Sequence, residues 1–440
     1  MNLRSRALAA AASALSLTFA LPAFAASQVE LAPAASPEAV GFDSARLKRL
    51  DDYMAKVVSD GRVAGMTTFL ARHDKVVEFK TYGEASLAKG TPMAKDEIFR
   101  LYSMTKPITG VAMMILFEEG KWSLDDPITK YIPEFKNLQV MTVDESGDVS
   151  LAPANRPPTM RELMSHTAGF GYGLGEASVV DRLYRKEQVL GSTGLKQMID
   201  RTAKIPLKFQ PGTDWAYSNA VDIQGYIVEK ISGEPFGQFL EEHIFKPLKM
   251  PDTAFQVAPA NVGRFAAVYV GDPATGKIIE PKTLFGFPIQ DYTQPALMES
   301  GGGGLTSTTM DYARFCQMIL NKGELDGVRI LSPASVELMD TNVIPDNVLV
   351  KSNGTSGERF NNAVGFGLDF EVVKDPRRAG LLEGKNTMSW GGAAGTWFWI
   401  DPTDDVIFVG MIQRLGDTGG DSLGDAARTL TYQALTHPEK

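Results

Sequence analysis

The sequence predicts a protein of two parts: an antiparallel sheet flanked by helices and assembled from both ends of the chain, and beside it a mostly helical part. Two observations support the sheet: a pair of strand patterns lies near the amino terminus, at 64–82, and another lies near the carboxyl terminus, at 395–412. A third observation, the long run of helical patterns between them, supports the helical part. Distant strand pairs with helical sequence between them favour a single sheet built from both ends.

These patterns divide the chain at two places. Residues 26–100 and 301–440 are assigned to a discontinuous α/β sheet domain, and 101–300 to a mostly helical domain. Four consecutive glycines at 301–304 mark the return to the sheet. Residues 1–25 are assigned to a signal peptide.

The amino terminus has the pattern of a secretory signal. Arg4 and Arg6 precede an apolar run from Ala7 to Leu21, and Ala23-Phe24-Ala25 has the A-x-A form of a cleavage site. An uncleaved membrane anchor is the alternative, and Pro22 with the small-residue site disfavours it. We therefore expect a periplasmic or secreted protein without a stable membrane anchor.

The first predicted elements are a helix and a hairpin. Apolar residues recur every three or four positions over 44–59, which predicts an amphipathic helix with Ser44 as its N-cap. Two strands at 64–71 and 76–82 flank the polar residues His73-Asp74-Lys75, as in a hairpin.

The middle of the chain is predicted to be helical. Residues 107–117 are apolar nearly all round, as expected for a helix buried on every side. Further helical patterns cover 195–201 and 220–232, and a hydroxyl-rich helix start follows the glycine run at 307–311. A second hairpin, 395–400 with 406–412, and a helix at 423–435 complete the sheet part.

Composition excludes several classes of function. The formal charge of the 440-residue chain is −9, so nucleic acid is not an expected partner. One cysteine excludes an intramolecular disulfide, and four histidines leave little material for a metal site. We expect no metal and no cofactor.

The motif S-x-x-K occurs twice. Ser103 and Lys106 stand at the start of the buried helix, where three-residue spacing places both on one face and the helix N-terminus favours a developing negative charge. A lysine activates a serine only where burial or neighbouring charge lowers its proton affinity, and this helix provides burial. Ser86 and Lys89 lie in a polar loop with no helix to align them.

Two more motifs carry groups suited to the same chemistry. Tyr217 begins the only Y-x-N sequence, ending at Asn219, on a loop before a helix, and its phenol is a second candidate for proton transfer. Trp390-Gly391-Gly392 precedes a strand, and paired glycines allow the backbone to approach a ligand closely. A backbone N–H at that point is a candidate for an oxyanion hole together with that of Ser103.

In this order, Ser103-x-x-Lys106, Tyr217-x-Asn219 and Trp390-Gly391-Gly392 resemble the serine beta-lactamase and penicillin-binding superfamily. Within it the chain is most similar to the class C lactamase-like family VIII carboxylesterases. The resemblance extends to the segments 122–127, 163–169 and 303–307, and spans about residues 40 to 435.

The resemblance implies a beta-lactamase-like fold and a metal-free acyl-enzyme mechanism. It makes Ser103 the nucleophile, lets Lys106 and Tyr217 share proton transfer, and gives Asn219 the task of orienting substrate or Lys106. It adds the N–H of Ala393 to the oxyanion hole. His166, in the segment 163–169, is by the same resemblance a hydrogen-bonding scaffold residue and not the partner of a Ser-His pair.

One departure bears on substrate. Penicillin-recognising relatives usually have Lys-Thr-Gly at the Trp390-Gly391-Gly392 position, and a tryptophan suits a neutral ester better than a carboxylate. We therefore expect a serine hydrolase that cleaves small-molecule esters with short to medium acyl groups. The alternatives are a beta-lactamase, a D-amino-acid peptidase, amidase or acyltransferase on the same scaffold, or a non-catalytic ligand-binding protein. The sequence does not predict an oligomeric state.

Overall fold

The centre of the protein is an eight-stranded antiparallel sheet. The computed structural model describes residues 30–144, 146–174, 178–284, 287–345, 348 and 363–438. The strand order is β14-β15-β16-β17-β18-β1-β2-β3. Its strands are β1 (Gly65–Arg72), β2 (Lys75–Ser86), β3 (Thr91–Pro92), β14 (Val364–Phe366), β15 (Glu371–Val373), β16 (Met388–Gly391), β17 (Trp397–Asp401) and β18 (Val406–Met411).

The two chain ends meet where β1 pairs with β18. Their antiparallel register places Phe69 opposite Val409. The predicted single sheet built from both ends of the chain is therefore confirmed. The signal pattern at 1–25 lies outside the described residues.

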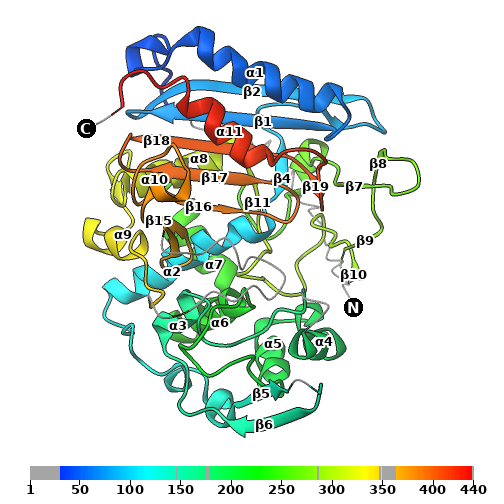
Figure 1. The fold of residues 1–440 in the computed structure, drawn as a ribbon, viewed down its shortest axis with the longest axis vertical. Helices are drawn as coiled ribbons and strands as arrows, with labels where there is room; N and C mark the ends of the chain where they lie inside the picture. The colour runs from blue at the N-terminus through cyan, green and yellow to red at the C-terminus, as the bar shows by residue number, and fades with distance from the viewer. Residues whose placement is uncertain are drawn as a thin grey trace, which may run out of the picture.

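Helices cover both faces of this sheet (Figure 1). Helices α1 (Ser44–Ser59) and α11 (Leu423–Tyr432) cover one face, and α8 (Thr309–Leu320) and α2 (Thr105–Glu118) lie on the other. Side chains alternate along each strand, so Trp399 faces α1 and α11 while its neighbour Phe398 faces α8. Trp399 stacks on Phe408 with ring centroids 4.4 Å apart.

Three boundaries differ from the prediction. The N-cap of α1 is Asp43, whose carboxylate accepts from the N–H of Arg46, and not Ser44. Strand β17 begins at Trp397, because Gly395 has φ 82° and belongs to the preceding turn. Helix α11 ends at Tyr432, three residues before the predicted Leu435. Local capping and turn geometry, which an apolar pattern does not encode, decides each case.

The helical part packs beneath the sheet around α6 (Ala220–Ser232), which lies against α2. Nine of the thirteen residues of α6 are buried. The remaining helices are α3 (Met160–Met164), α4 (Val179–Lys186), α5 (Leu195–Thr202), α7 (Phe236–Leu240), α9 (Pro333–Met339) and α10 (Pro376–Ala379).

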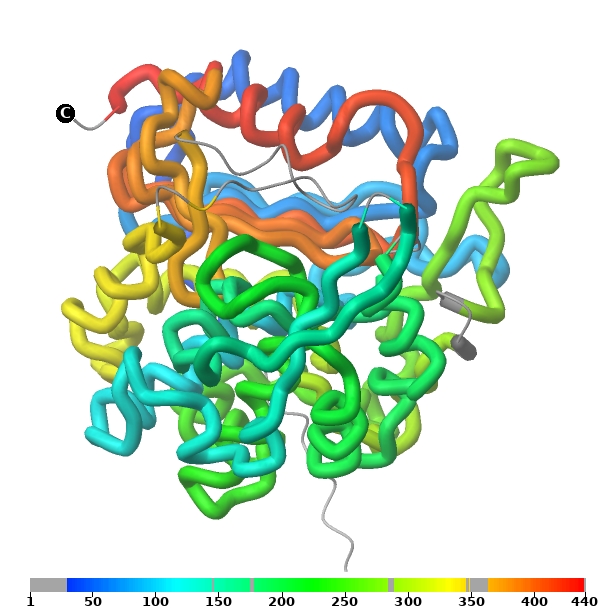
Figure 2. Tube along the Cα trace, turned by 60° about the horizontal axis from the view of Figure 1, so that its bottom comes forward, coloured from blue at the N-terminus to red at the C-terminus, as the bar shows by residue number. Residues whose placement is uncertain are grey.

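Short strands accompany these helices. In Figure 2 the hairpin of β5 and β6 lies on the outside of the helical part. Strand β4 pairs with β11; β11 continues directly into α8, and β4 leads through a 3₁₀ helix into α2. The bounds are β4 (Ile98–Arg100), β5 (Gln139–Val143), β6 (Val149–Pro153), β7 (Tyr269–Gly271), β8 (Ile278–Ile279), β9 (Thr283–Leu284), β10 (Phe287–Pro288), β11 (Thr306–Thr308), β12 (Glu324–Leu325), β13 (Val328–Arg329) and β19 (Arg414–Leu415).

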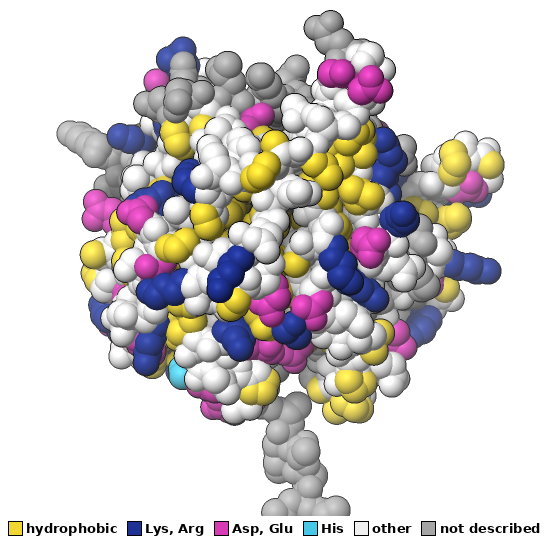
Figure 3. All heavy atoms as spheres, turned by 90° about the horizontal axis from the view of Figure 1, so that it is seen from below, with side chains coloured by type: hydrophobic (Ala, Val, Ile, Leu, Met, Phe, Trp, Pro, Cys, Tyr) yellow, Lys and Arg dark blue, Asp and Glu magenta, His cyan; other side chains and the backbone are white. Residues whose placement is uncertain are grey.

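The surface of the helical end carries mixed charge. Figure 3 shows basic and acidic side chains interspersed over this face. Several of them pair, for example Lys196 with Asp200 and Lys130 with Asp126. Within the described ranges, no helix is both long and apolar enough to cross a bilayer.

Candidate active site

Ser103 stands at the junction of the sheet and the helical part. Strand β4 ends at Arg100, a 3₁₀ helix spans Tyr102–Met104, and α2 continues from Thr105. Tyr102 has φ 45°, in the left-handed region that a tyrosine rarely adopts. Strain of this kind is maintained by surrounding packing and is concentrated at functional sites. The tight turn places Ser103 ahead of α2, at the positive end of its dipole.

Lys106 lies beside Ser103 and is only 1% exposed. Its Nζ donates to the carbonyl oxygen of Gly302 at 2.6 Å, to Tyr172 Oη at 3.1 Å and to Ser103 Oγ at 3.4 Å. It also lies 4.5 Å from the centroid of the Tyr217 ring. A buried lysine with these partners is held in one place, directed at the serine.

Tyr217 completes the group from the loop between α5 and α6. Its hydroxyl donates to Ser103 Oγ at 2.7 Å. Aromatic neighbours fix the ring, with centroid distances of 5.1 Å to His166, 5.2 Å to Tyr172 and 5.5 Å to Trp390. The structure therefore brings together Ser103, Lys106 and Tyr217, which are far apart in sequence.

The Trp390-Gly391-Gly392 segment ends β16 next to this group. A Cβ on Gly392 would lie 2.2 Å from the carbonyl oxygen of Leu101, so only glycine fits where this strand meets the backbone before Ser103. Thr396 strengthens the contact by donating to the same oxygen at 3.3 Å. Gly391 is half-buried at the end of the strand, and the Trp390 ring faces Tyr217.

Ala393 follows in the turn between β16 and β17 and is exposed. Among the described residues its backbone N–H has no hydrogen-bond partner. A backbone amide that is not engaged elsewhere can donate to a developing oxyanion.

Asn219 stands at the N-cap of α6. Its side chain is fully buried, donates to Thr202 Oγ1 at 3.1 Å and accepts from Tyr184 at 3.4 Å. These partners belong to the neighbouring helices α5 and α4. That Asn219 orients substrate or Lys106 stays a prediction.

His166 lies behind Tyr217 and makes no hydrogen bond with Ser103. Its Nδ1 bonds Ser218 Oγ at 2.9 Å, and among the described residues Nε2 has no partner. Burial, with a smaller contribution from the charge of Lys106, holds the pKa of His166 well below its usual 6.5. The imidazole is therefore neutral and packs against the ring of Tyr217, as expected of a scaffold residue.

Tyr172 is a site residue that the motifs did not reveal. Its hydroxyl accepts from Lys106, while its backbone N–H donates to the Asp181 carboxylate at 2.8 Å. Burial and the nearby Asp222 raise its pKa well above the usual value, so the phenol stays neutral. The sequence carries one feature that could have revealed it: Tyr172 stands between Gly171 and Gly173, shortly after the segment 163–169.

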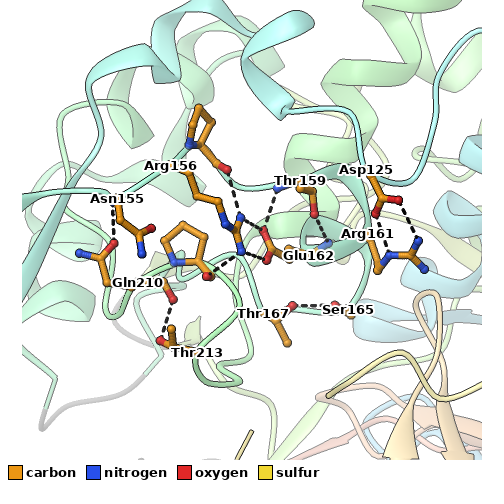
Figure 4. Close-up of polar contacts among 12 residues, drawn as sticks. Asp125, Asn155, Arg156, Thr159, Arg161, Glu162, Ser165, Thr167, Gln210 and Thr213 are labelled. Atoms are coloured by element: carbon orange, nitrogen blue, oxygen red, sulfur yellow. Dashed lines mark hydrogen bonds and ion pairs between the residues drawn. The ribbon is translucent and has the colours of Figure 1, made fainter. Parts of the chain in front are cut away.

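A polar network joins the start of α3 to neighbouring loops of the helical part (Figure 4). Glu162 forms a capping box with Thr159 at the start of α3 and pairs with Arg156. Arg156 also donates to the carbonyl oxygen of Pro211 at 3.0 Å. Because Pro211 begins the loop that carries Tyr217, this network ties α3 to that loop. Hydrogen bonds of this kind, between residues that support a site, help to keep a catalytic group in its required geometry.

Metal ligands are not gathered here. In the described part of the chain, no group of three or more His, Cys, Asp or Glu side chains could hold a metal ion. The single cysteine, Cys316, is buried in α8.

The chain is similar to known proteins over most of its length. The family model described as Beta-lactamase matches residues 50–433. Protein Rv1367c of Mycobacterium tuberculosis (strain ATCC 25618 / H37Rv) is 35% identical over 376 residues, which cover 84% of this chain and 91% of that protein. Esterase EstB of Burkholderia gladioli is 31% identical over 381 residues, which cover 83% and 90%.

A solved structure is also similar. "EstCE1, a hydrolase with promiscuous acyltransferase activity" matches with a TM-score of 0.73 at 25% identity, covering 88% of this chain and 99% of that one.

Proposed function

The chain belongs to the beta-lactamase family and is a serine hydrolase, and from this we propose that it is a carboxylesterase for small-molecule esters with short to medium acyl groups. Family membership confirms the resemblance seen in the motifs and the beta-lactamase-like fold. The choice of ester substrates is supported by the named activity of EstB and by the side chain at position 390.

One observation carries the proposal. Ser103 Oγ accepts hydrogen bonds from both Tyr217 at 2.7 Å and Lys106 at 3.4 Å, at the start of a helix. A serine hydroxyl becomes a nucleophile only when a base within hydrogen-bond reach takes its proton. Two such groups converge on this serine, and both are held by burial or ring packing.

The reaction begins with acylation. As Ser103 Oγ attacks the ester carbonyl, its proton passes to the Lys106–Tyr217 pair, with the phenol as the nearer group. The C–O bond to the alcohol then breaks, and the alcohol leaves with a proton returned by Tyr217. An ester of Ser103 remains on the enzyme.

Deacylation repeats these steps with water. The same pair takes a proton from water, which attacks the acyl-serine, and Ser103 leaves with its proton restored. In both halves the carbonyl oxygen becomes an anion, and we assign the N–H groups of Ser103 and Ala393 to hold it. The helix dipole at Ser103 adds stabilisation of the same sign.

The site is suited to a neutral substrate. The centroid of the Trp390 ring lies 5.5 Å from that of Tyr217 and 5.4 Å from that of Phe366. These rings form an apolar wall next to Tyr217, whose hydroxyl bonds Ser103. A beta-lactam brings a carboxylate, whose removal from water is costly without a cation to receive it. An indole offers flat apolar contact and no charge. This difference favours esters over cephalosporins.

A labelling experiment tests the proposal directly. The protein is treated with a fluorophosphonate and mapped by peptide mass spectrometry, and is assayed with chromogenic esters of increasing acyl length and with a chromogenic cephalosporin. We expect the adduct on Ser103, an ester burst equal to the enzyme concentration, and fastest turnover with the shorter esters. An adduct elsewhere contradicts the nucleophile, faster cephalosporin turnover favours a beta-lactamase, and no burst favours a ligand-binding protein.

We further propose that the enzyme acts in the periplasm or outside the cell. Support comes from the basic, apolar and A-x-A pattern of residues 1–25. Sequencing the amino terminus of the protein from a periplasmic fraction should find Ala26 as the first residue. A full-length protein retained in the cytoplasm would contradict this.

A further inference from the structure

A second apolar cluster lies next to Ser103 and is not used in the mechanism above. In this group, the Tyr102 cluster, Tyr102, Val270 and Ile289 pack against the buried side chains of Val268, Ala394 and Leu415. Tyr102, Val270 and Ile289 are only half-buried, so part of their apolar surface stays accessible to a ligand. Burial raises the pKa of Tyr102, and its phenol is therefore neutral.

Neighbours in sequence place the Tyr102 cluster beside the reacting atoms. Tyr102 directly precedes the nucleophile Ser103, and Ala394 directly follows Ala393, whose N–H we assign to the oxyanion. The N–H of Arg414 donates to the carbonyl oxygen of Ala394 at 2.8 Å and so ties β19 to this turn. The cluster is therefore connected both to the nucleophile and to the oxyanion hole.

Two paired strands hold the outer part of the cluster. Strand β19 pairs with β7 in parallel, which places Leu415 opposite Val270, and the two strands lie together in Figure 1. The N–H of Tyr269 extends this pairing by donating to the carbonyl oxygen of Gln413 at 2.9 Å. Side chains on paired strands keep a defined geometry, as a substrate site requires.

Tyr102 occupies its place at a conformational cost. Its φ of 45° lies in the left-handed region, which glycine adopts freely and a residue with a Cβ does not. A large aromatic ring at such a position indicates that the side chain itself has a task.

The Tyr102 cluster is separate from the aromatic rings on the other side of Ser103. Those rings, among them Tyr217, Phe366 and Trp390, belong to a cluster built from β14, β16 and the loop before α6. Among the described residues the two clusters share no member. Ser103 thus has one apolar cluster beside Tyr217 and another beside Tyr102.

Proton transfer decides which arm of an ester lies against which cluster. Tyr217 returns a proton to the leaving alcohol, so the alcohol oxygen must lie within hydrogen-bond distance of the phenol. The alcohol arm therefore lies on the side of Tyr217 and Trp390. The acyl chain is bonded to the same carbonyl carbon and diverges from the alcohol oxygen, which directs it away from Tyr217 and toward the Tyr102 cluster.

We propose that the Tyr102 cluster is the acyl subsite and that the ring of Tyr102 limits the length of the acyl chain. This inference rests on the proposed function and adds to it the residues that select the acyl group. The ring packs against the buried side chains of Val268 and Leu415. Removing it opens an apolar space into which a longer chain can extend.

The test is a panel of esters that varies one arm at a time. The first series holds 4-nitrophenyl esters of straight-chain acids of increasing length, and the second holds butanoate esters of straight-chain alcohols of increasing length. In Tyr102→Ala, kcat/KM for longer acyl chains should rise relative to the wild type by about fourfold for each added methylene that becomes buried. The profile of the alcohol series should stay as in the wild type.

Tyr53→Ala is the matched control. Tyr53 is also half-buried, but it lies in α1 and packs in the cluster on the other face of the sheet. Both of its profiles should coincide with those of the wild type. An equal acyl shift in this control, or a shift of Tyr102→Ala in the alcohol series in place of the acyl series, would overturn the proposal.

Val270→Phe supplies a variant with the opposite expected effect. It adds volume to the cluster, so the preference should move to shorter acyl chains, and it carries the test alone if Tyr102→Ala does not fold by circular dichroism. Mass spectrometry of the ester-treated wild type finds the residue that is acylated. If Ser103 is acylated and the folded variants keep the wild-type acyl profile, only this inference fails; if Ser103 is not acylated, the proposed function fails.

Discussion

The two S-x-x-K sequences of this chain have the same residues and different surroundings. Ser103 accepts hydrogen bonds from Lys106 and Tyr217, and its lysine is buried under two tyrosines and a carbonyl oxygen. Ser86 ends β2, where it pairs with Thr91 of the edge strand β3, and Lys89 is exposed in the turn between these strands. Only the first serine has a base directed at it.

The difference shows that spacing alone does not make a nucleophile. Three-residue spacing aligns two side chains only on a helix, and Ser86 is followed by a turn. Lys89 is also exposed, whereas Lys106 is buried beside its serine and within hydrogen-bond reach of it, as a base must be. Reactivity thus resides in the packing around the motif.

The largest expected effect comes from removing each serine. Ser103→Ala should lower kcat for a chromogenic ester by about 10⁴- to 10⁶-fold, because it removes the hydroxyl on which the proposed acyl-enzyme forms. Ser86→Ala should keep wild-type turnover. Steady-state kinetics on both purified variants, with circular dichroism to verify folding, test this, and equal losses in the two variants would break the comparison.

Removing the base gives the next effect. Lys106→Ala and Tyr217→Phe should each lower kcat by about 10²- to 10⁴-fold, since each takes one proton acceptor from Ser103. Lys89→Ala is the matched control and should leave kcat unchanged. The relative loss in the two active-site variants also identifies the dominant base, which the geometry leaves open. Wild-type activity in Lys106→Ala would remove the lysine from the mechanism.

Much of the fold could be predicted from sequence. Strand and helix periodicities reflect burial, so the hairpins at both termini, the buried helix α2 and helix α6 were predicted close to their observed bounds. Caps and turns depend on individual side chains, and for that reason Asp43 and not Ser44 caps α1.

The candidate site was predicted in part. Ser103, Lys106 and Tyr217 were found because each belongs to a short motif. Tyr172 was missed because it reaches Lys106 through a tertiary contact, by way of a glycine-flanked loop. The role of Asn219 stays a prediction, since the motif gives its position and not the direction of its side chain, which bonds Thr202 and Tyr184.

A smaller effect, on the preference for esters over cephalosporins, should follow from changing Trp390. A charge-assisted hydrogen bond contributes about 1.5–3 kcal/mol, or roughly 10- to 150-fold in kcat/KM if it forms in the transition state. The wild type should prefer neutral short-chain esters to cephalosporins by at least this factor. Trp390→Lys should narrow the preference by supplying a cation. Competing ester and cephalosporin assays on both proteins measure it.

Trp390→Phe is the control for Trp390→Lys. Trp390→Phe removes the indole but keeps an aromatic ring facing Tyr217, so ester turnover should persist without a gain in cephalosporin turnover. A wild-type enzyme that cleaves cephalosporins as fast as esters would contradict the substrate assignment and require another cation for the carboxylate.

The smallest expected effect concerns His166, which contributes to the surroundings of Tyr217 without touching Ser103. Its pKa is held well below 6.5 in the folded protein, mainly by burial. Below pH 6.5 the unfolded chain therefore takes up a proton that the folded protein does not, and stability is lost as the pH falls. The loss from this group is about 1.4 kcal/mol per pH unit.

His166→Gln removes that proton and keeps an amide that can bond Ser218. Between pH 6.5 and 5 the free energy of unfolding of the wild type should fall more steeply than that of the variant, because all other titrating groups are common to both proteins. Urea unfolding at pH 5, 6 and 7 measures the difference, and ester turnover at alkaline pH should largely persist. Parallel stability curves would show that His166 accepts a proton in the folded state, and a folded but inactive variant would make the imidazole part of the catalytic group after all.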